Sequence, residues 1–219
     1  MLLVPFVSFF APANAVAPII NIGNFIGRPA RIFLFWQHIA WPVVFAYLPG
    51  ALLGALVGGW LLKGLNLDWV QLLLGLFLIS TLFQFKLGKK EQSFSMHLRA
   101  FPILGFFVAA LSTVAGATGA VLNPFFINYG VTKERLVATK AFNSFAVALI
   151  QIPTYYALGL LSRDVLTAGL AIGVGAFLGN YLGKKMLHKM TNRQFLIWVT
   201  AAMVFAGVVM VVKAARNLM

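Results

Sequence analysis

Long apolar runs, separated by short polar stretches, dominate this sequence. The clearest runs cover residues 42–62, 69–85, 133–160, 165–183 and 195–213. A run of about 20 apolar residues is long enough to cross the hydrocarbon core of a bilayer. Only 10% of the residues are charged, against roughly 25% in soluble domains. Because lipid offers the backbone no hydrogen-bond partners, the sequence predicts an all-α polytopic membrane protein.

The charged residues are mostly basic, and the formal net charge is +13. In a membrane protein, Lys and Arg mark cytoplasmic loops next to anionic lipid, so we expect no nucleic-acid partner. The chain has no cysteine and three widely separated histidines, which predicts neither a metal site nor a cofactor. It also lacks paired carboxylates, a histidine cluster and a Ser-His-Asp set. We therefore do not expect an enzyme.

Two halves of the chain resemble each other. "LVPF" (Leu3–Phe6) matches "LNPF" (Leu122–Phe125), and the same offset carries Asn21 onto Lys140 and Asn24 onto Asn143. "GALVGGW" (Gly54–Trp60) matches "GAFLGNY" (Gly175–Tyr181) at nearly the same offset. Ordered matches of this kind indicate structural repeats. We predict one transmembrane domain over residues 1–219, with repeat one at 1–86, a cytoplasmic linker at 87–97 and repeat two at 98–215.

The basic loops favour an inverted arrangement of the repeats. If 100–115 and 119–130 form a hairpin with its tip at Gly116–Gly119, most basic loops lie on one face, as the positive-inside rule requires. Each repeat is then a broken or re-entrant element followed by about three transmembrane helices, and the C-terminus lies outside. Repeat one lacks a counterpart of 100–115: either that helix is dispensable, or the given start is downstream of the real one. The polar stretch "GRPAR" (Gly27–Arg31) interrupts the apolar run of residues 13–38.

Glycine turns and interrupted helices inside a membrane expose backbone N–H groups that favour an anion. Lys140 lies about two helical turns beyond Lys133, at a depth where a lysine usually faces a pathway or a partner. Asn143 and Thr139 lie beside it, and Asn21 and Asn24 occupy the related positions of repeat one. The candidate substrate-binding residues are Asn21, Asn24, Gly116, Gly119, Asn123, Thr139, Lys140 and Asn143, and the candidate pathway residues are Arg28, Arg31 and Gln151.

Structural explanations stay open for several of these residues. Lys140 could extend to the interface, Arg28 and Arg31 could anchor to lipid headgroups, and the hairpin glycines could serve only close packing. Tyr155 and Tyr156 are interpreted as part of an aromatic belt. The glycines at i, i+4 spacing are interpreted as helix-packing grooves: Gly54, Gly58, Gly175, Gly179 and Gly183.

Four motifs resemble the TauE/SafE family of sulfite exporters. They are "LLVPF" (Leu2–Phe6), "LPGALLGALVGGWLL" (Leu48–Leu62), "GATGAVLNPFF" (Gly116–Phe126) and "VATKAFNS" (Val137–Ser144). The resemblance implies a transporter of sulfite, sulfoacetate, thiosulfate or related small anions, for which coupling to protons is often supposed.

We therefore expect a multi-pass protein of the inner membrane that acts as a secondary transporter of small sulfur-containing anions. It would work by alternating access, most simply as an exporter. Two alternatives stay open: a passive anion channel, and a structural membrane subunit completed by a partner helix. Coupling to protons and assembly into a homodimer also stay open.

Overall fold

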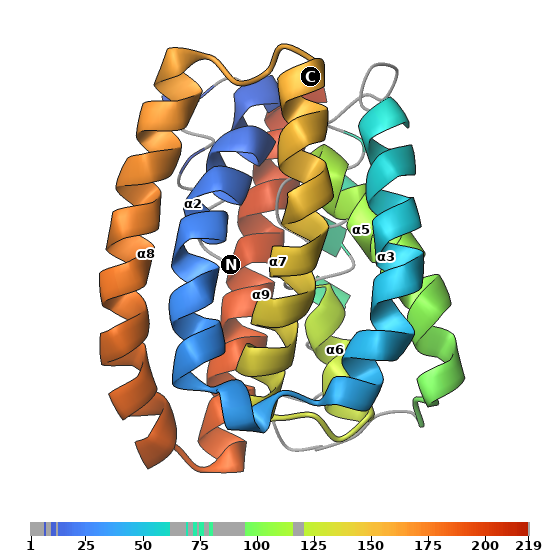
Figure 1. Ribbon diagram of the computed structural model, residues 1–219, viewed down its shortest axis with the longest axis vertical. Helices are drawn as coiled ribbons and strands as arrows, with labels where there is room; N and C mark the ends of the chain where they lie inside the picture. The colour runs from blue at the N-terminus through green and yellow to red at the C-terminus, as the bar shows by residue number, and fades with distance from the viewer. Residues whose placement is uncertain are drawn as a thin grey trace.

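The computed structural model describes residues 7, 10, 11, 13–61, 69, 72, 73, 75, 76, 79, 80, 95–115 and 121–218. These residues form helices and short connections, without a strand among them (Figure 1). The long elements are α2 (Ala13–Leu34), α3 (Trp41–Leu61), α5 (Phe101–Ala115), α7 (Lys133–Ala157), α8 (Arg163–Lys189) and α9 (Asn192–Leu218). The short ones are η1 (Trp36–His38), η2 (Leu98–Ala100) and α6 (Leu122–Asn128).

The fold class is the one the apolar runs predict. Three stretches of the described helices are long and apolar enough to cross a membrane: Trp41–Leu61, Lys133–Ala157 and Asn192–Arg216. The shorter stretch Leu98–Val114 is also apolar. Large apolar side chains such as Phe45, Trp60 and Phe177 are exposed on the outside of the bundle, where lipid can cover them. The protein is thus an all-α polytopic membrane protein.

Helices α2 and α7 form an antiparallel pair within the bundle. Arg28 of α2 bonds to Ser144 of α7, whereas Asn21 bonds to Tyr155, so the numbering rises in one helix as it falls in the other. Helix α8 packs against α2, and α3 packs against both α7 and α5. Figure 1 shows α8 at one edge of the bundle and α3 at the opposite edge.

The polar stretch Gly27–Arg31 does not break the helix, because α2 is helical from Ala13 through to Leu34. Pro29 removes one backbone donor, but close packing supports the helix on either side of it. A Cβ added to Gly23 or Gly27 would collide with Ile172 or Ala176 of α8. These contacts hold α2 against its neighbour along its length.

The α5–α6 segment has the geometry of a hairpin. The ring of Phe101, at the start of α5, contacts the rings of Phe126 and Tyr129 at the end of α6, with centroids 5.4 and 5.2 Å apart. The chain therefore enters and leaves this segment on the same side. The predicted tip, Gly116–Gly119, lies outside the described residues.

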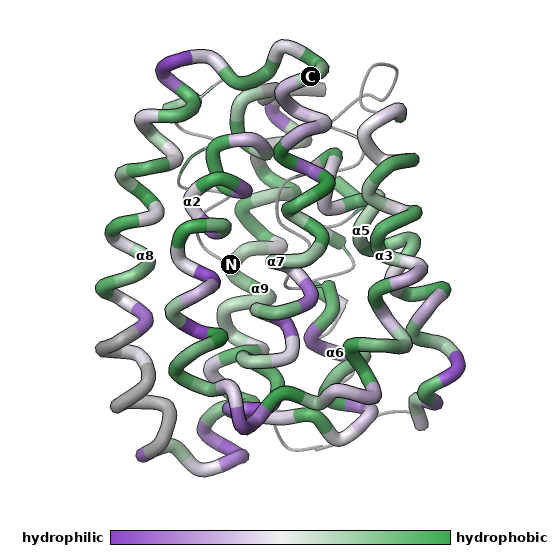
Figure 2. The backbone as a smooth tube through the Cα atoms, in the orientation of Figure 1, coloured by the Kyte–Doolittle hydropathy of each residue, from purple (hydrophilic) through white to green (hydrophobic). Residues whose placement is uncertain are grey.

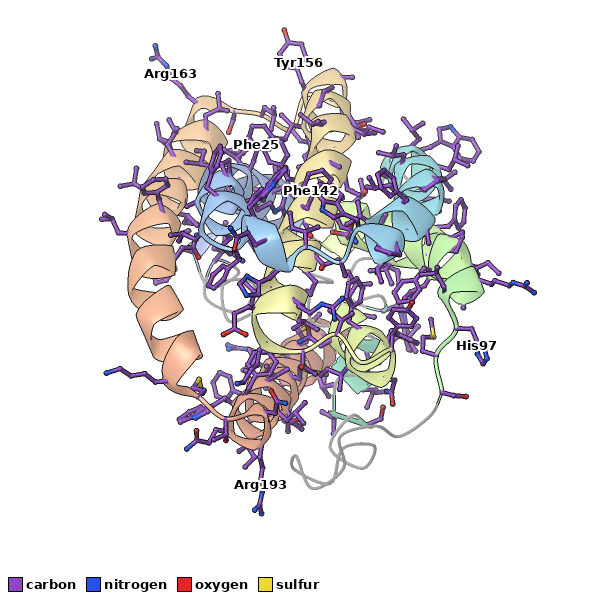
Figure 3. All side chains as sticks on the ribbon, turned by 60° about the horizontal axis from the view of Figure 1, so that its bottom comes forward. Phe25, His97, Phe142, Tyr156, Arg163 and Arg193 are labelled. Atoms are coloured by element: carbon purple, nitrogen blue, oxygen red, sulfur yellow. The ribbon has the colours of Figure 1, made fainter. Side chains whose placement is uncertain are left out.

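Basic residues concentrate at the side of the bundle where α7 begins. Helix α8 runs parallel to α2, since Gly23 meets Ile172 and Gly27 meets Ala176, so α8 also ends on this side. The basic residues there are Arg99, Lys133, Arg135, Lys184, Lys185, Lys189 and Arg193. Figure 3 shows Arg193 and Arg163 pointing away from the bundle at well-separated places. The distribution supports a cytoplasmic assignment for the basic side.

Helices α3 and α5 approach each other through glycine. A Cβ added to Gly50, Gly54 or Gly58 would lie within 3.0 Å of the carbonyl oxygens of α5, which real Cβ atoms essentially never do. Those oxygens belong to Pro102, Phe106 and Ala110. Small residues allow such backbone approach in membranes, where packing replaces the hydrophobic driving force. The interpretation of Gly54 and Gly58 as packing positions is confirmed.

The same interpretation is wrong for Gly175, Gly179 and Gly183. A Cβ added at any of them would meet open space. Helix α8 instead turns a different glycine pair, Gly169 and Gly173, toward Ile22 and Ile26 of α2. Glycine spacing alone does not reveal which of two stripes on a helix faces a neighbour.

The direction of the helices predicts the location of the C-terminus. A reporter enzyme fused after Met219 should be active on the periplasmic side, because α9 begins at the basic side and runs to the opposite one. Activity of paired cytoplasmic and periplasmic reporters in cells would measure this. A cytoplasmic readout would contradict the orientation.

The glycine contacts predict a position-specific effect on stability. Gly54→Leu should lower the stability by at least about 2 kcal/mol, since an overpacked interface must move apart. Gly179→Leu is the matched control and should leave the melting temperature unchanged, because open space surrounds that position. Intrinsic tryptophan fluorescence of the detergent-purified proteins during heating would report both. Equal melting temperatures for the two variants would rule out the tight α3–α5 contact.

Candidate anion site

Three basic side chains from α2 and α7 lie close together inside the bundle. Arg28, Arg31 and Lys140 are here called the cation cluster. Arg28 and Arg31 lie one turn apart on α2, and Arg28 bonds to Ser144, which lies one turn beyond Lys140 on α7. Figure 2 shows hydrophilic segments of α2, α6 and α7 within the height of the bundle, where neighbouring segments are hydrophobic. Like charges held together away from water are costly, which points to a function for this arrangement.

Arg28 is buried, with 8% of its surface exposed. Its Nη1 donates a hydrogen bond of 2.8 Å to the backbone carbonyl of Ser144. Ser144 lies 11 residues beyond Lys133, about 16 Å along the helix. Arg28 therefore lies inside the bundle and is bonded to the backbone of α7. The sequence could not identify Ser144 as its partner, because the contact is made by a backbone group.

Lys140 points into the bundle and does not extend to the interface. Its Nζ donates a hydrogen bond to Oδ1 of Asn123, which is fully buried in α6. Aromatic packing positions α6, with Phe126 edge-to-face against Tyr47 and Phe101. The structure thus brings together Lys140 and Asn123, two of the predicted binding residues.

Asn143 is the most unusual polar residue of the site. It is fully buried, and neither its amide nitrogen nor its amide oxygen has a hydrogen-bond partner among the described residues. Arg31 Nε is also buried without a partner there. Each such group costs roughly 1–3 kcal/mol when left unsatisfied. Asn143 follows Lys140 by three residues on α7, so the two side chains lie on the same side of that helix.

Thr139 has a structural contact. Its Oγ1 accepts a hydrogen bond of 2.9 Å from the backbone N–H of Ala40, immediately before α3 begins. This bond fixes the connection between η1 and α3 against α7. Asn24 is half-buried on α2, while Gly116 and Gly119 lie outside the described residues.

Asn21 and Gln151 belong to a second group, here called the polar layer, together with Thr113 and Tyr155. Asn21 Nδ2 donates to the Tyr155 hydroxyl at 3.0 Å, and that hydroxyl donates to the Thr113 carbonyl at 2.7 Å. Gln151 Nε2 donates to Thr113 Oγ1 at 2.9 Å. All four residues are buried, so the polar layer ties α2, α5 and α7 together.

Asn21 and Lys140 make different contacts. Asn21 bonds to Tyr155, which lies 15 residues beyond Lys140 and about 22 Å further along α7, whereas Lys140 bonds to Asn123. The belt interpretation is wrong for Tyr155, which is buried, although Tyr156 is 77% exposed. The i, i+4 spacing of Gln151 and Tyr155, on one side of α7, was the signal that could have revealed the buried tyrosine.

Two of the four carboxylates lie in the first turns of described helices. Glu134 is in the first turn of α7, six residues before Lys140, and Asp164 is in the first turn of α8 at the opposite side. The three residues of the cation cluster are all basic.

Comparison with known proteins identifies the family. The family model described as sulfite exporter TauE/SafE matches residues 1–210 of the 219. No curated protein and no solved structure matches the chain. With nearly the whole chain matched, the protein belongs to the TauE/SafE sulfite exporter family of membrane transporters, as its motifs predicted.

Proposed function

We propose that this protein exports small sulfur-containing oxyanions, such as sulfite or an organosulfonate, across the inner membrane by alternating access. The observation that carries the proposal is the cation cluster between α2 and α7, in which Arg28 is buried and Arg31 and Lys140 are half-buried. Beside it, the amide of Asn143 has no partner among the described residues. An anion bound there would offset the repulsion between the basic groups and satisfy the buried donors.

The strength of such a site follows from its surroundings. Two unit charges 4 Å apart attract by about 1 kcal/mol in water and about 4 kcal/mol at the effective dielectric constant of a partly buried site. Binding would displace the water around a small oxyanion, and the guanidinium and ammonium groups would replace the lost hydrogen bonds. The positive charge of the cluster attracts anions and repels cations, so the site would select an anion over a cation.

The polar layer supports a carrier in preference to an open channel. Its four buried, mutually bonded side chains lie between the cation cluster and the side where α7 ends. An anion at the cluster would meet this layer on its way out. Export would then require the layer to separate, as when one helical repeat moves against the other.

Lys140 provides the direct test of the site. Lys140→Met should lower the rate of sulfite efflux by tenfold or more, since losing one charge of a buried hydrogen-bonded site costs roughly 2–5 kcal/mol. Efflux from proteoliposomes loaded with sulfite would measure it, with sulfonates as competing substrates.

Lys189→Met is the matched control for this measurement. It removes the same charge from the exposed end of α8, and its efflux rate should equal that of the unmodified protein. Efflux that is unchanged in Lys140→Met would remove Lys140, and with it the cation cluster, from the transport pathway.

A second measurement separates a carrier from a channel. In planar bilayers that contain the purified protein and a sulfite gradient, we expect no unitary current steps, because the polar layer closes the path from the cation cluster. Proteoliposomes from the same preparation should show efflux that saturates with sulfite concentration. Unitary anion currents would instead establish a channel.

A further inference from the structure

Asn143 presents one hydrogen-bond donor and one acceptor at the candidate site, and both are unpaired among the described residues. In either orientation of the amide, one N–H₂ donor and one carbonyl acceptor lack a partner among the described residues. The acceptor is informative, because an anion without hydrogen atoms on its polar groups cannot satisfy it.

The groups around Asn143 supply donors. Lys140 Nζ and Arg28 Nη1 are donors already bonded to Asn123 Oδ1 and to the Ser144 carbonyl, and Arg31 Nε is a donor without a described partner. A bare oxyanion would therefore satisfy the donors and leave the Asn143 oxygen buried and unpaired. A ligand that also carries an O–H or N–H group would satisfy both.

The spacing sets the size of this ligand. Residues at i and i+3 on a helix have Cβ atoms about 5–6 Å apart. One small ligand could therefore contact both Lys140 and Asn143. A ligand with its anionic group at Lys140 and its donor at the Asn143 amide would therefore have only a few bonds between the two groups.

We infer that the site selects small monoanions that bear a hydrogen-bond donor of their own, such as hydrogensulfite or a two-carbon sulfonate with a terminal hydroxyl. This inference rests on the proposed function and specifies the substrate class of the same site. Asn143 is the residue that determines this specificity: its carbonyl accepts the donor of the substrate, and its N–H₂ donates to an anionic oxygen.

Two sulfonates of equal size test the inference. 2-Hydroxyethanesulfonate and 1-propanesulfonate have the same number of non-hydrogen atoms and differ only in a terminal hydroxyl or methyl group. The purified protein should bind the hydroxyl compound about tenfold more tightly, since the methyl compound leaves a buried acceptor unpaired. Isothermal titration in detergent would give both dissociation constants.

Substitution of Asn143 should remove the preference without removing binding. In Asn143→Leu the two sulfonates should bind equally, while Thr200→Val should retain the tenfold ratio. Thr200 is the matched control, because its hydroxyl is also buried and unpaired among the described residues but lies on α9. Asn143→Ser provides a second variant if the leucine variant fails to fold, and it should reduce the ratio.

The outcomes distinguish the inference from the proposed function. Equal binding of both sulfonates by the unmodified protein would overturn the inference but would not contradict the proposed anion site. A ratio that persists in Asn143→Leu and Asn143→Ser would overturn the role of Asn143. If neither sulfonate binds and neither slows sulfite efflux, both the inference and the proposed function fail.

Discussion

The burial of positive charge between two antiparallel helices is the constraint on which the rest of this structure depends. Moving a cation from water into a low-dielectric interior costs several kcal/mol even after relaxation. This cost applies to Arg28, Arg31 and Lys140. Hydrogen bonds from Arg28 to the Ser144 carbonyl and from Lys140 to the Asn123 amide oxygen offset part of it. In a chain with only four acidic residues, the remaining compensation is most simply supplied by an anion from outside the chain.

Close helix packing makes this arrangement stable. Glycines on α3 let the backbone of α5 approach, and glycines on α2 and α8 interlock with Ile and Ala side chains. These contacts hold the outer helices against α2 and α7, so that the inner faces of the central pair can carry polar groups. In a membrane, where apolar surface alone gives no driving force for association, such packing carries much of the stability of the bundle.

The polar groups of the interior occupy two levels with different chemistry. The cation cluster lies toward the basic side, and Arg31 and the nearby Asn143 have buried polar atoms without a partner among the described residues. The polar layer lies further along α7, and its bonds join three helices, although Asn21 Oδ1 there also lacks a described partner. The bonds between three helices are the physical basis for proposing a closure that opens during transport.

Amino-acid sequence alone determined the fold class, the family and the presence of polar residues at membrane depth, because apolar length, charge content and motif order are properties of the chain. It also predicted Lys140 and Asn123 as site residues, and the structure joins them. Tertiary structure decided which polar residues share a level: Asn21 bonds to Tyr155 and not to the Lys140 group, and Thr139 supports α3. It also decided that Gly54 faces a neighbour while Gly179 does not. Helical spacing gives the face on which a residue lies, but the partner on that face depends on how separate helices pack, and no local pattern contains that information.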